Sequence, residues 1–236
     1  MLTANSRLAE TRARQSLGSS GSAIYQMVVR ALSQRGVQGD ILMDVGCGTG
    51  ALWPYVRNRF ARYVGVDVVE YEGRPAELEF HRLDLDSGSP SLPDEYADVV
   101  VSVETIEHLE NPRAFFRELF RLAKPGGWLV ITTPNQLSAL SLLTLLVKQR
   151  FSAFQDKLYP SHITALLEID LLRIARECCV TDISVMYSQS GRIVLTPWHY
   201  PRFVSRVFPR ATSDNVLIVA RKSGSTEHAV HSQVAG

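Results

Sequence analysis

The stretch LMDVGCGTG, residues 42–50, constrains the fold more than any other part of this chain. An apolar run ends at Val45, and glycines then occupy positions 46, 48 and 50. Glycine weakens a strand, but it permits positive φ angles and lets other groups approach the backbone closely. The stretch therefore predicts a buried strand followed by a tight turn at which a ligand meets the main chain.

Short β-rich runs alternate with helical stretches along the rest of the chain, which is typical of an α/β protein. We predict a doubly wound, seven-stranded sheet, mostly parallel with an antiparallel edge strand. The last two strands read as a hairpin-like pair that closes one edge. The expected strands are residues 40–45, 61–68, 77–84, 97–103, 127–133, 181–187 and 215–222.

Helices are expected between these strands. The clearest spans residues 111–123, with Asn111 as N-cap and Pro112 at the first helical position. Others are expected at about 22–35, from near Ala51, and over 164–179.

The two ends of the chain lack hydrophobic periodicity, so burial cannot offset the entropy of ordering them. We expect a flexible segment at 1–20, one domain at 21–222 and a disordered tail at 223–236.

Residues 135–151, NQLSALSLLTLLVKQRF, depart from the alternation. The apolar stretch at 137–147 is too short for a transmembrane helix, and Ser138, Ser141 and Thr144 interrupt it at every third position. We expect a helical lid insertion at about 135–163, with the apolar stripe of its helix facing a core. The open alternatives are an oligomer contact and peripheral contact of 137–147 with a bilayer surface.

Composition excludes several classes of protein. The chain has 236 residues and a net charge of +1, so no nucleic-acid partner is expected from its overall charge. Its three cysteines, Cys47, Cys178 and Cys179, form no disulfide framework, and the first residues contain no secretory signal. A reducing, cytoplasmic location is the simplest interpretation.

Acidic residues after the glycine turn indicate a nucleoside ligand. Asp67 ends the second predicted strand, 21 residues after Gly46, where a carboxylate can accept hydrogen bonds from ribose hydroxyls. Asp84 closes the third strand and Glu104 the fourth, while the turn KPGG leads into the fifth. Gly46, Gly48 and Ala51 also satisfy the relaxed dinucleotide pattern, so the glycines alone do not identify the nucleoside.

Together these motifs resemble class I S-adenosylmethionine-dependent methyltransferases of the small-molecule type, similar to the ubiquinone-pathway and type 11 enzymes. The resemblance covers Ile41 to Asn135 and includes VETIEHLENP and KPGG in family order. It implies a Rossmann-like fold, S-adenosylmethionine as cofactor and methyl transfer as activity. It places Asp44, Gly46, Gly48 and Gly50 near the methionine part, Asp67 on the ribose, and Asp84 with Leu85 at the adenine. Cys47 and Glu104 are also expected to bind the cofactor.

The acceptor is expected to be a small molecule methylated on oxygen, such as a glycan, quinone, phenol or natural-product precursor. His108 follows the fourth strand on the acceptor side, and its ordinary pKa suits a general base at neutral pH, so His108 with Glu107 is the catalytic candidate. The purely structural alternative for His108 stays open.

The same segment raises a metal hypothesis. In a helical turn Glu104, Glu107 and His108 share one face, and His162 can add a fourth ligand. The string ETIEH resembles the metal-binding segment of small-RNA 2′-O-methyltransferases and of ubiquinone-pathway O-methyltransferases. Leu109, however, stands where the RNA enzymes carry a second histidine. A divalent metal is therefore not favoured over a structural role for these residues.

Acceptor specificity is expected in the variable parts at about 22–35, 135–163 and 188–214. The last contains Arg192, Arg202, Arg206 and Arg210 near Trp198, which suits an anionic, ring-bearing or lipid-linked acceptor. A solvated loop anchored by aromatic packing is the alternative.

Three alternative functions remain at this stage: a metal-dependent RNA 2′-O-methyltransferase, an NAD-dependent oxidoreductase, and a catalytically silent cofactor-binding scaffold. The chain has no Tyr-x-x-x-Lys pair to support a short-chain oxidoreductase. The sequence does not determine the oligomeric state.

Overall fold

Strand β1, Gly39–Val45, is central to the sheet, and all its residues from Ile41 onward are buried. In this computed structural model, which describes residues 4–87, 91–178 and 180–224, β1 pairs in parallel with β2 on one side and β4 on the other. Successive side chains point to opposite faces, so Leu42 enters one hydrophobic core and Met43 the other. A nearly continuous apolar run is typical of a parallel strand covered on both faces.

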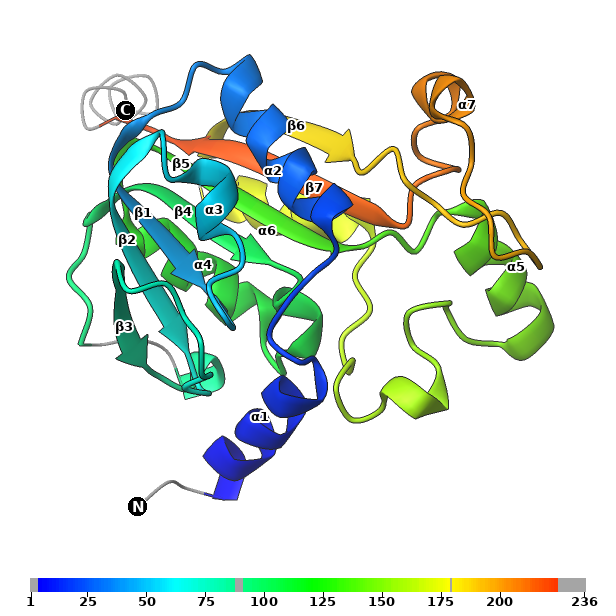
Figure 1. Cartoon of the computed structure of the whole chain (residues 1–236), viewed down its shortest axis with the longest axis horizontal. Coiled ribbons are helices and arrows are strands. Elements are labelled where there is room, and N and C mark those ends of the chain that lie inside the picture. The colour runs from blue at the N-terminus through cyan, green and yellow to red at the C-terminus, as the bar shows by residue number, and fades with distance from the viewer. Residues whose placement is uncertain (1–3, 88–90, 179, 225–236) are drawn as a thin grey trace, which may run out of the picture.

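Seven strands form one sheet in the order β3-β2-β1-β4-β5-β7-β6 (Figure 1). Strand β7 runs antiparallel to both of its neighbours, β5 and β6. The predicted fold class is confirmed, with the antiparallel strand one position in from the edge. The other strands are β2 Phe60–Asp67, β3 Leu78–Arg82, β4 Ala97–Val103, β5 Ala123–Pro134, β6 Val180–Tyr187 and β7 Asn215–Lys222.

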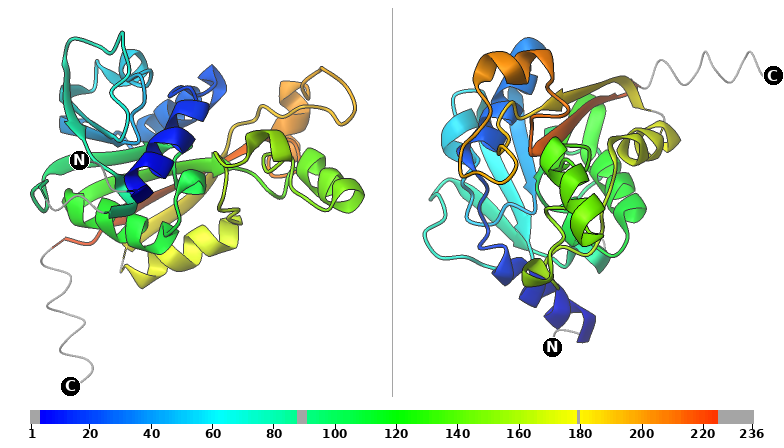
Figure 2. Two further views of the ribbon diagram at one scale, coloured as in Figure 1. Left: turned by 90° about the horizontal axis from the view of Figure 1, so that it is seen from below. Right: turned by 90° about the vertical axis from the view of Figure 1, so that its right-hand side faces the viewer.

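Helices cover both faces of the sheet (Figure 2). Helices α2 and α3 pack on one face, where Met27 and Val28 meet Leu42 and Val101, and helices α4 and α6 pack on the other. The helices and 3-10 turns are α1 Ala4–Gln15, α2 Ser22–Gln34, α3 Trp53–Val56, η1 Leu85–Ser87, η2 Ile106–His108, α4 Pro112–Leu122, α5 Ala139–Lys148, η3 Asp156–Leu158, α6 Glu168–Glu177 and α7 Arg202–Val207.

Helix α4 agrees with its sequence pattern. The Asn111 side chain accepts a hydrogen bond of 3.0 Å from the amide of Ala114, which satisfies one of the free donors at the helix start. Phe116 and Leu119 on its apolar face are fully buried. Local capping and periodicity thus determine this element.

Two other predicted helices are shorter than expected. The helix predicted over 164–179 begins only at Glu168, because the amides of Ile163 and Thr164 both donate to the Glu107 carbonyl, each at 3.0 Å. The helix expected from near Ala51 is the four-residue α3, which begins at Trp53. In the first case, contacts with a distant turn of the chain override local helix propensity.

The N-terminal segment differs from the expected flexible segment, because residues 4–15 form helix α1. Arg12 is buried and pairs with Asp86 at 2.9 Å and with Glu110 at 3.0 Å. These ion pairs, a hydrogen bond from Tyr71 to the Ala13 carbonyl, and a small apolar cluster of Ala9 with Val68 and Val69 hold α1 against the domain. Of the tail expected to be disordered, residues 225–236 lie outside the described residues.

Helix α5 corrects the expectation that its apolar stripe faces a core. Its polar side is the buried one: Ser141 is fully buried, and its hydroxyl accepts a hydrogen bond of 3.2 Å from the amide of Ser152. Leu146 and Val147 are 80% and 72% exposed. Within the described residues, no helix has the length and apolar character needed to cross a bilayer.

The packing of α4 generates a stability prediction. We expect Leu119→Ala to lower the free energy of unfolding by about 2–5 kcal/mol, because it leaves a cavity in the core between α4 and the sheet. Leu146→Ala removes the same atoms from an exposed site and should change the free energy of unfolding by less than about 0.5 kcal/mol. Urea unfolding followed by circular dichroism measures both; equal effects would contradict this packing.

Candidate active site

The glycine turn after β1 is crowded by protein atoms. Gly46, Gly48 and Gly50 have φ angles of 83°, 51° and 74°, which residues other than glycine rarely adopt. A Cβ on Gly46 would lie 2.1 Å from Oγ1 of Thr105, and one on Gly48 would lie 2.1 Å from the carbonyl oxygen of Gly18. From the sequence we expected a ligand to approach these glycines closely. In the structure, atoms of the N-terminal segment and of the turn after β4 occupy much of the space beside them.

Asp67, at the end of β2, is bound to this turn. Its buried carboxylate accepts hydrogen bonds from the amides of Gly48 and Val69, both at 2.9 Å. Burial raises the pKa of Asp67, while these backbone bonds and the nearby His108 act to lower it. The carboxylate therefore fixes the glycine turn relative to β2 and still reaches the adjoining cavity.

A cavity of about 350 Å³ opens at the carboxyl ends of β1, β2 and β4. In open α/β sheets this edge is where ligands bind. The structure brings most of the predicted site residues together here. The predicted residues that line it are Gly46, Gly48, Asp67, Asp84, Leu85, Glu104, Glu107, His108 and His162.

Asp44, Cys47 and Gly50 do not line this cavity in the structure. Asp44 is buried beneath the turn, where Tyr63 donates to it at 2.5 Å, and burial raises its pKa to about 7. Cys47 is also buried, and burial raises the pKa of its thiol. Gly50 faces Pro75 on the other side of the turn.

Glu104 turns away from the histidines. Its φ angle is 50°, and its carboxylate accepts hydrogen bonds from the Thr132 hydroxyl at 2.8 Å and the Asn215 amide at 2.7 Å. Burial raises the pKa of Glu104, and the negative charge of Glu107 raises it further. Glu104 therefore ties the start of the η2 turn to β5 and β7.

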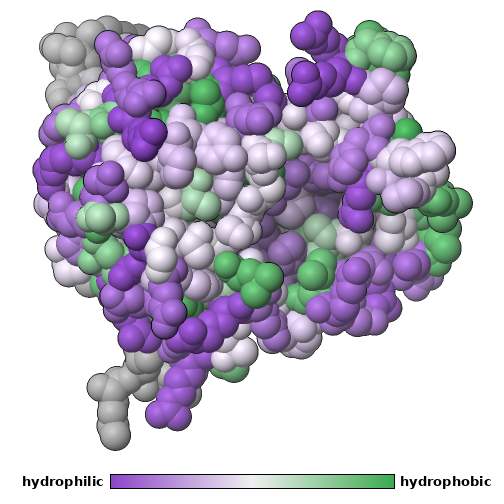
Figure 3. Space-filling model, in the orientation of Figure 1, coloured by the Kyte–Doolittle hydropathy of each residue, from purple (hydrophilic) through white to green (hydrophobic). Residues whose placement is uncertain are grey.

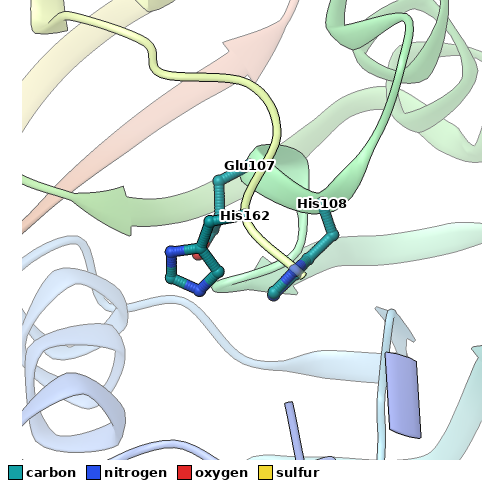
Figure 4. A group of neighbouring side chains, drawn as sticks. All are labelled: Glu107, His108 and His162. Atoms are coloured by element: carbon teal, nitrogen blue, oxygen red, sulfur yellow. The ribbon is translucent and has the colours of Figure 1, made fainter. Parts of the chain in front are cut away.

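Glu107, His108 and His162 lie side by side (Figure 4), with one ligand atom from each within 4.8 Å of the others. The first two come from η2, and His162 comes from the loop before α6. Oε2 of Glu107 accepts from the Thr133 hydroxyl at 3.2 Å, while Oε1 is buried without a hydrogen-bond partner among the described residues. Burial raises the pKa of Glu107 to about 8.

Backbone carbonyls fix the tautomers of both histidines. Nδ1 of His108 donates to the Ser161 carbonyl, and Nδ1 of His162 donates to the Ala153 carbonyl, both at 2.7 Å. In each neutral ring, Nε2 is then the unprotonated nitrogen. Burial lowers the pKa of His108; burial and the neighbouring His108 lower that of His162 to about 4. Both rings are therefore neutral at pH 7.

Sequence reasoning missed the N-terminal contribution to the cavity. Arg12 and Ser16 of this segment line it, and the Gly18 carbonyl accepts a 2.8 Å hydrogen bond from the amide of Thr49 in the glycine turn. One local signal was present in the sequence: Glu10 and Arg14 are spaced i,i+4, and they form an ion pair of 2.7 Å on α1.

Comparison with known proteins identifies the family. A model described as a methyltransferase domain matches residues 22–213, which is most of the chain. The chain belongs to the methyltransferase domain family. Its cofactor is S-adenosylmethionine.

Similar proteins carry methyltransferase names. A ubiquinone biosynthesis O-methyltransferase of Pseudomonas fluorescens is 31% identical over 110 residues, 43% of this chain and 47% of that protein. One from Idiomarina loihiensis is 26% identical over 159 residues, 64% of this chain and 65% of that protein. The chain thus spans about half the length of most of the curated relatives it matches.

Solved structures show the same fold. A SAM-dependent methyltransferase from Archaeoglobus fulgidus superposes with a TM-score of 0.58 at 20% identity, covering 84% of this chain and 94% of that one. One from Mesorhizobium loti has a TM-score of 0.56 at 17% identity, covering 86% and 99%.

The cavity of this methyltransferase domain fits the cofactor. Gly46 and Gly48 of the glycine turn line the cavity, and Asp67 and Asp84 border the same space. These groups can receive an amino-acid arm and a ribose-adenine unit through backbone contacts and carboxylate acceptors.

The crowding at Gly48 generates a binding prediction. We expect Gly48→Ala to weaken S-adenosylmethionine binding by at least about tenfold, because the new Cβ collides with the Gly18 carbonyl and shifts the turn. Gly36→Ala is the matched control: its φ angle is 61°, but nothing lies within 4 Å of the added Cβ. Titration calorimetry measures both dissociation constants; an unchanged value for Gly48→Ala would contradict the assigned site.

Proposed function

We propose that this methyltransferase domain methylates an oxygen of a small-molecule acceptor, with His108 as the general base. The observation that supports this role is the fixed tautomer of His108, whose Nδ1 donates to the Ser161 carbonyl. The ring borders the same cavity as Gly46 and Asp67, so a base and the proposed cofactor contacts share one space.

S-adenosylmethionine, when bound, supplies a methyl group already activated by its sulfonium. The protein then has to hold the acceptor in line, exclude water and remove one proton. When the acceptor oxygen is methylated, Nε2 of His108 would take up the proton that this hydroxyl loses. The lowered pKa of His108 keeps this nitrogen unprotonated at neutral pH.

An anionic, ring-bearing or lipid-linked acceptor fits the rest of the chain. The segments 137–163 and 188–214 carry cationic side chains together with exposed aromatic and aliphatic ones. The relatives named ubiquinone biosynthesis O-methyltransferases support oxygen as the acceptor atom. The cytoplasmic location expected from the sequence stays a prediction.

We expect His108→Ala to lower kcat by about 10²–10⁴-fold and to change the dissociation constant for S-adenosylmethionine by less than about twofold, because the base acts only on the acceptor. His81→Ala is the control: His81 lies on β3, does not line the cavity and should leave kcat unchanged when replaced. A radiolabelled methyl assay with phenolic and quinol acceptors measures turnover. Equal turnover of His108→Ala and the wild type would reject the assignment.

The pH dependence tests the same assignment. Because burial lowers the pKa of His108, the base stays neutral until the pH falls below its ordinary value of 6.5. Activity should therefore be flat at neutral pH and decline only below about pH 6.5 as Nε2 is protonated. His108→Ala should lose this acid limb.

A second candidate is metal-assisted methyl transfer, including transfer to an RNA 2′-hydroxyl. Glu107, His108 and His162 offer one carboxylate and two imidazoles, whose ligand atoms lie within 4.8 Å of one another and would have to close slightly around a small divalent cation. Of the four predicted ligands, Glu104 is directed elsewhere. A bound cation would polarise the acceptor oxygen and lower its pKa.

Chelation distinguishes the two candidates. Metal assistance predicts that EDTA abolishes activity, that Mg²⁺ or Mn²⁺ restores it, and that His162→Ala is as damaging as His108→Ala. The general-base proposal predicts that activity survives EDTA. An NAD-dependent oxidoreductase would instead show a nicotinamide absorbance change, and a silent scaffold would bind S-adenosylmethionine without turnover on any acceptor.

A further inference from the structure

A lobe projects from the carboxyl end of β5, formed by residues 137–159 and 188–214 (Figures 1 and 2). We call it the α5–α7 lobe, after its two helices. The two segments are joined at their bases: the amide of Ala139 donates to the Ala211 carbonyl at 2.8 Å, and the Asn135 side chain donates to the Arg210 carbonyl at 2.7 Å. They therefore belong to one lobe.

Helix α5 exposes its apolar face and buries its polar face, which is the reverse of a helix packed on a core. Leu142, Leu143, Leu146 and Val147 follow a helical spacing that places them on one face, and all four are exposed. The opposite side is held inward by Ser138 and Ser141. Because exposed aliphatic rows are unfavourable in water, this face indicates an apolar or interfacial partner.

The second segment continues the apolar surface with large side chains. Trp198, Phe203 and Phe208 are 72%, 72% and 62% exposed. Ten of the fourteen large apolar side chains that are exposed in the described part of the chain belong to the lobe. Figure 3 shows such side chains beside strongly polar ones on this side of the molecule. Aromatic rings of this kind favour the boundary between water and lipid.

The lobe is also strongly cationic. Residues 137–159 carry three basic and one acidic side chain, and residues 188–214 carry four arginines and one aspartate, a net charge of +5. The whole chain has a net charge of +1, so the rest of it is negative. Lys148, Lys157, Arg202 and Arg206 form no ion pair among the residues that the structure describes.

We propose that the α5–α7 lobe docks on an anionic lipid bilayer. The aliphatic and aromatic side chains would enter the headgroup boundary while lysines and arginines contact lipid phosphates, as in helices that lie in the plane of a membrane. A second copy of the chain is a poorer occupant. Two lobes of charge +5 placed face to face would repel each other.

Docking there would orient the cavity toward the bilayer. Leu158 of the lobe lines the cavity, together with Ser161 and His162, which directly follow it in the chain. An acceptor with a long apolar tail could keep that tail in the lipid while its hydroxyl reaches His108. This statement about the acceptor rests on the proposed function, whereas docking itself does not.

Vesicle sedimentation tests docking without any methyl transfer. The full chain is mixed with phosphatidylcholine vesicles containing 30% phosphatidylglycerol, or with phosphatidylcholine alone. Binding should require the anionic lipid and weaken as salt increases. Trp198 provides a second readout: its fluorescence should shift to the blue on binding, and Trp198→Phe should remove most of that shift.

Two double variants separate the contribution of charge from that of the apolar side chains to vesicle binding. Arg202→Glu with Arg206→Glu, and Leu146→Asp with Val147→Asp, should each lower vesicle partitioning at least about tenfold. Arg57→Glu with Arg117→Glu is the control for charge, because these arginines are exposed outside the lobe, and Leu8→Asp is the control for apolar exposure.

The proposal is supported if the lobe variants lose vesicle binding and the control variants keep it, even if no acceptor is methylated. The proposal is overturned if the chain ignores anionic vesicles, or if the control variants lose as much binding as the lobe variants. It is also overturned if light scattering shows a stable dimer that Leu146→Asp with Val147→Asp dissociates, because the apolar face would then be covered by a second copy.

Discussion

The site depends on the buried carboxylate of Asp67. Its two oxygens accept from the amides of Gly48 and Val69, so one side chain joins the glycine turn to the end of β2. A buried carboxylate costs free energy unless backbone donors compensate it, and here one of those donors, the Gly48 amide, belongs to the turn that has to be positioned. The exposed backbone of the cavity and the acid beside it are thus one structural unit.

A second constraint lies at the turn after β4. The Glu107 carbonyl accepts from Ile163 and Thr164, and the Ser161 carbonyl accepts from His108, so the η2 turn and the loop before α6 hold each other. This reciprocal arrangement brings His162 beside His108 although 53 residues separate Ser161 from His108 in the chain. The two histidines are therefore positioned by hydrogen bonds from Nδ1 to backbone carbonyls, and both residues line the cavity.

The two ends of the cavity have different character. The glycine turn and the N-terminal segment form an end made of backbone and small polar groups, held by the ion pairs of Arg12 with Asp86 and Glu110. The other end leads to the α5–α7 lobe, which combines exposed apolar side chains with positive charge. A polar cofactor and an amphipathic acceptor fit these two ends, which is why the proposed chemistry and the proposed docking surface support each other.

Sequence alone determined the strands, helix α4 and the chemical types at the sheet edge, because periodicity, capping and glycine spacing are local properties. Tertiary structure decided where side chains without local constraints point. Glu104 borders the cavity but directs its carboxylate to β5 and β7, and Asp44 lies beneath the turn, although each belongs to a motif that supplies cavity residues. Helix α1 forms through ion pairs with residues more than 70 positions away, and α5 turns its apolar face outward because its serines bond inward. Such choices depend on partners that are distant in sequence, and no local pattern records them.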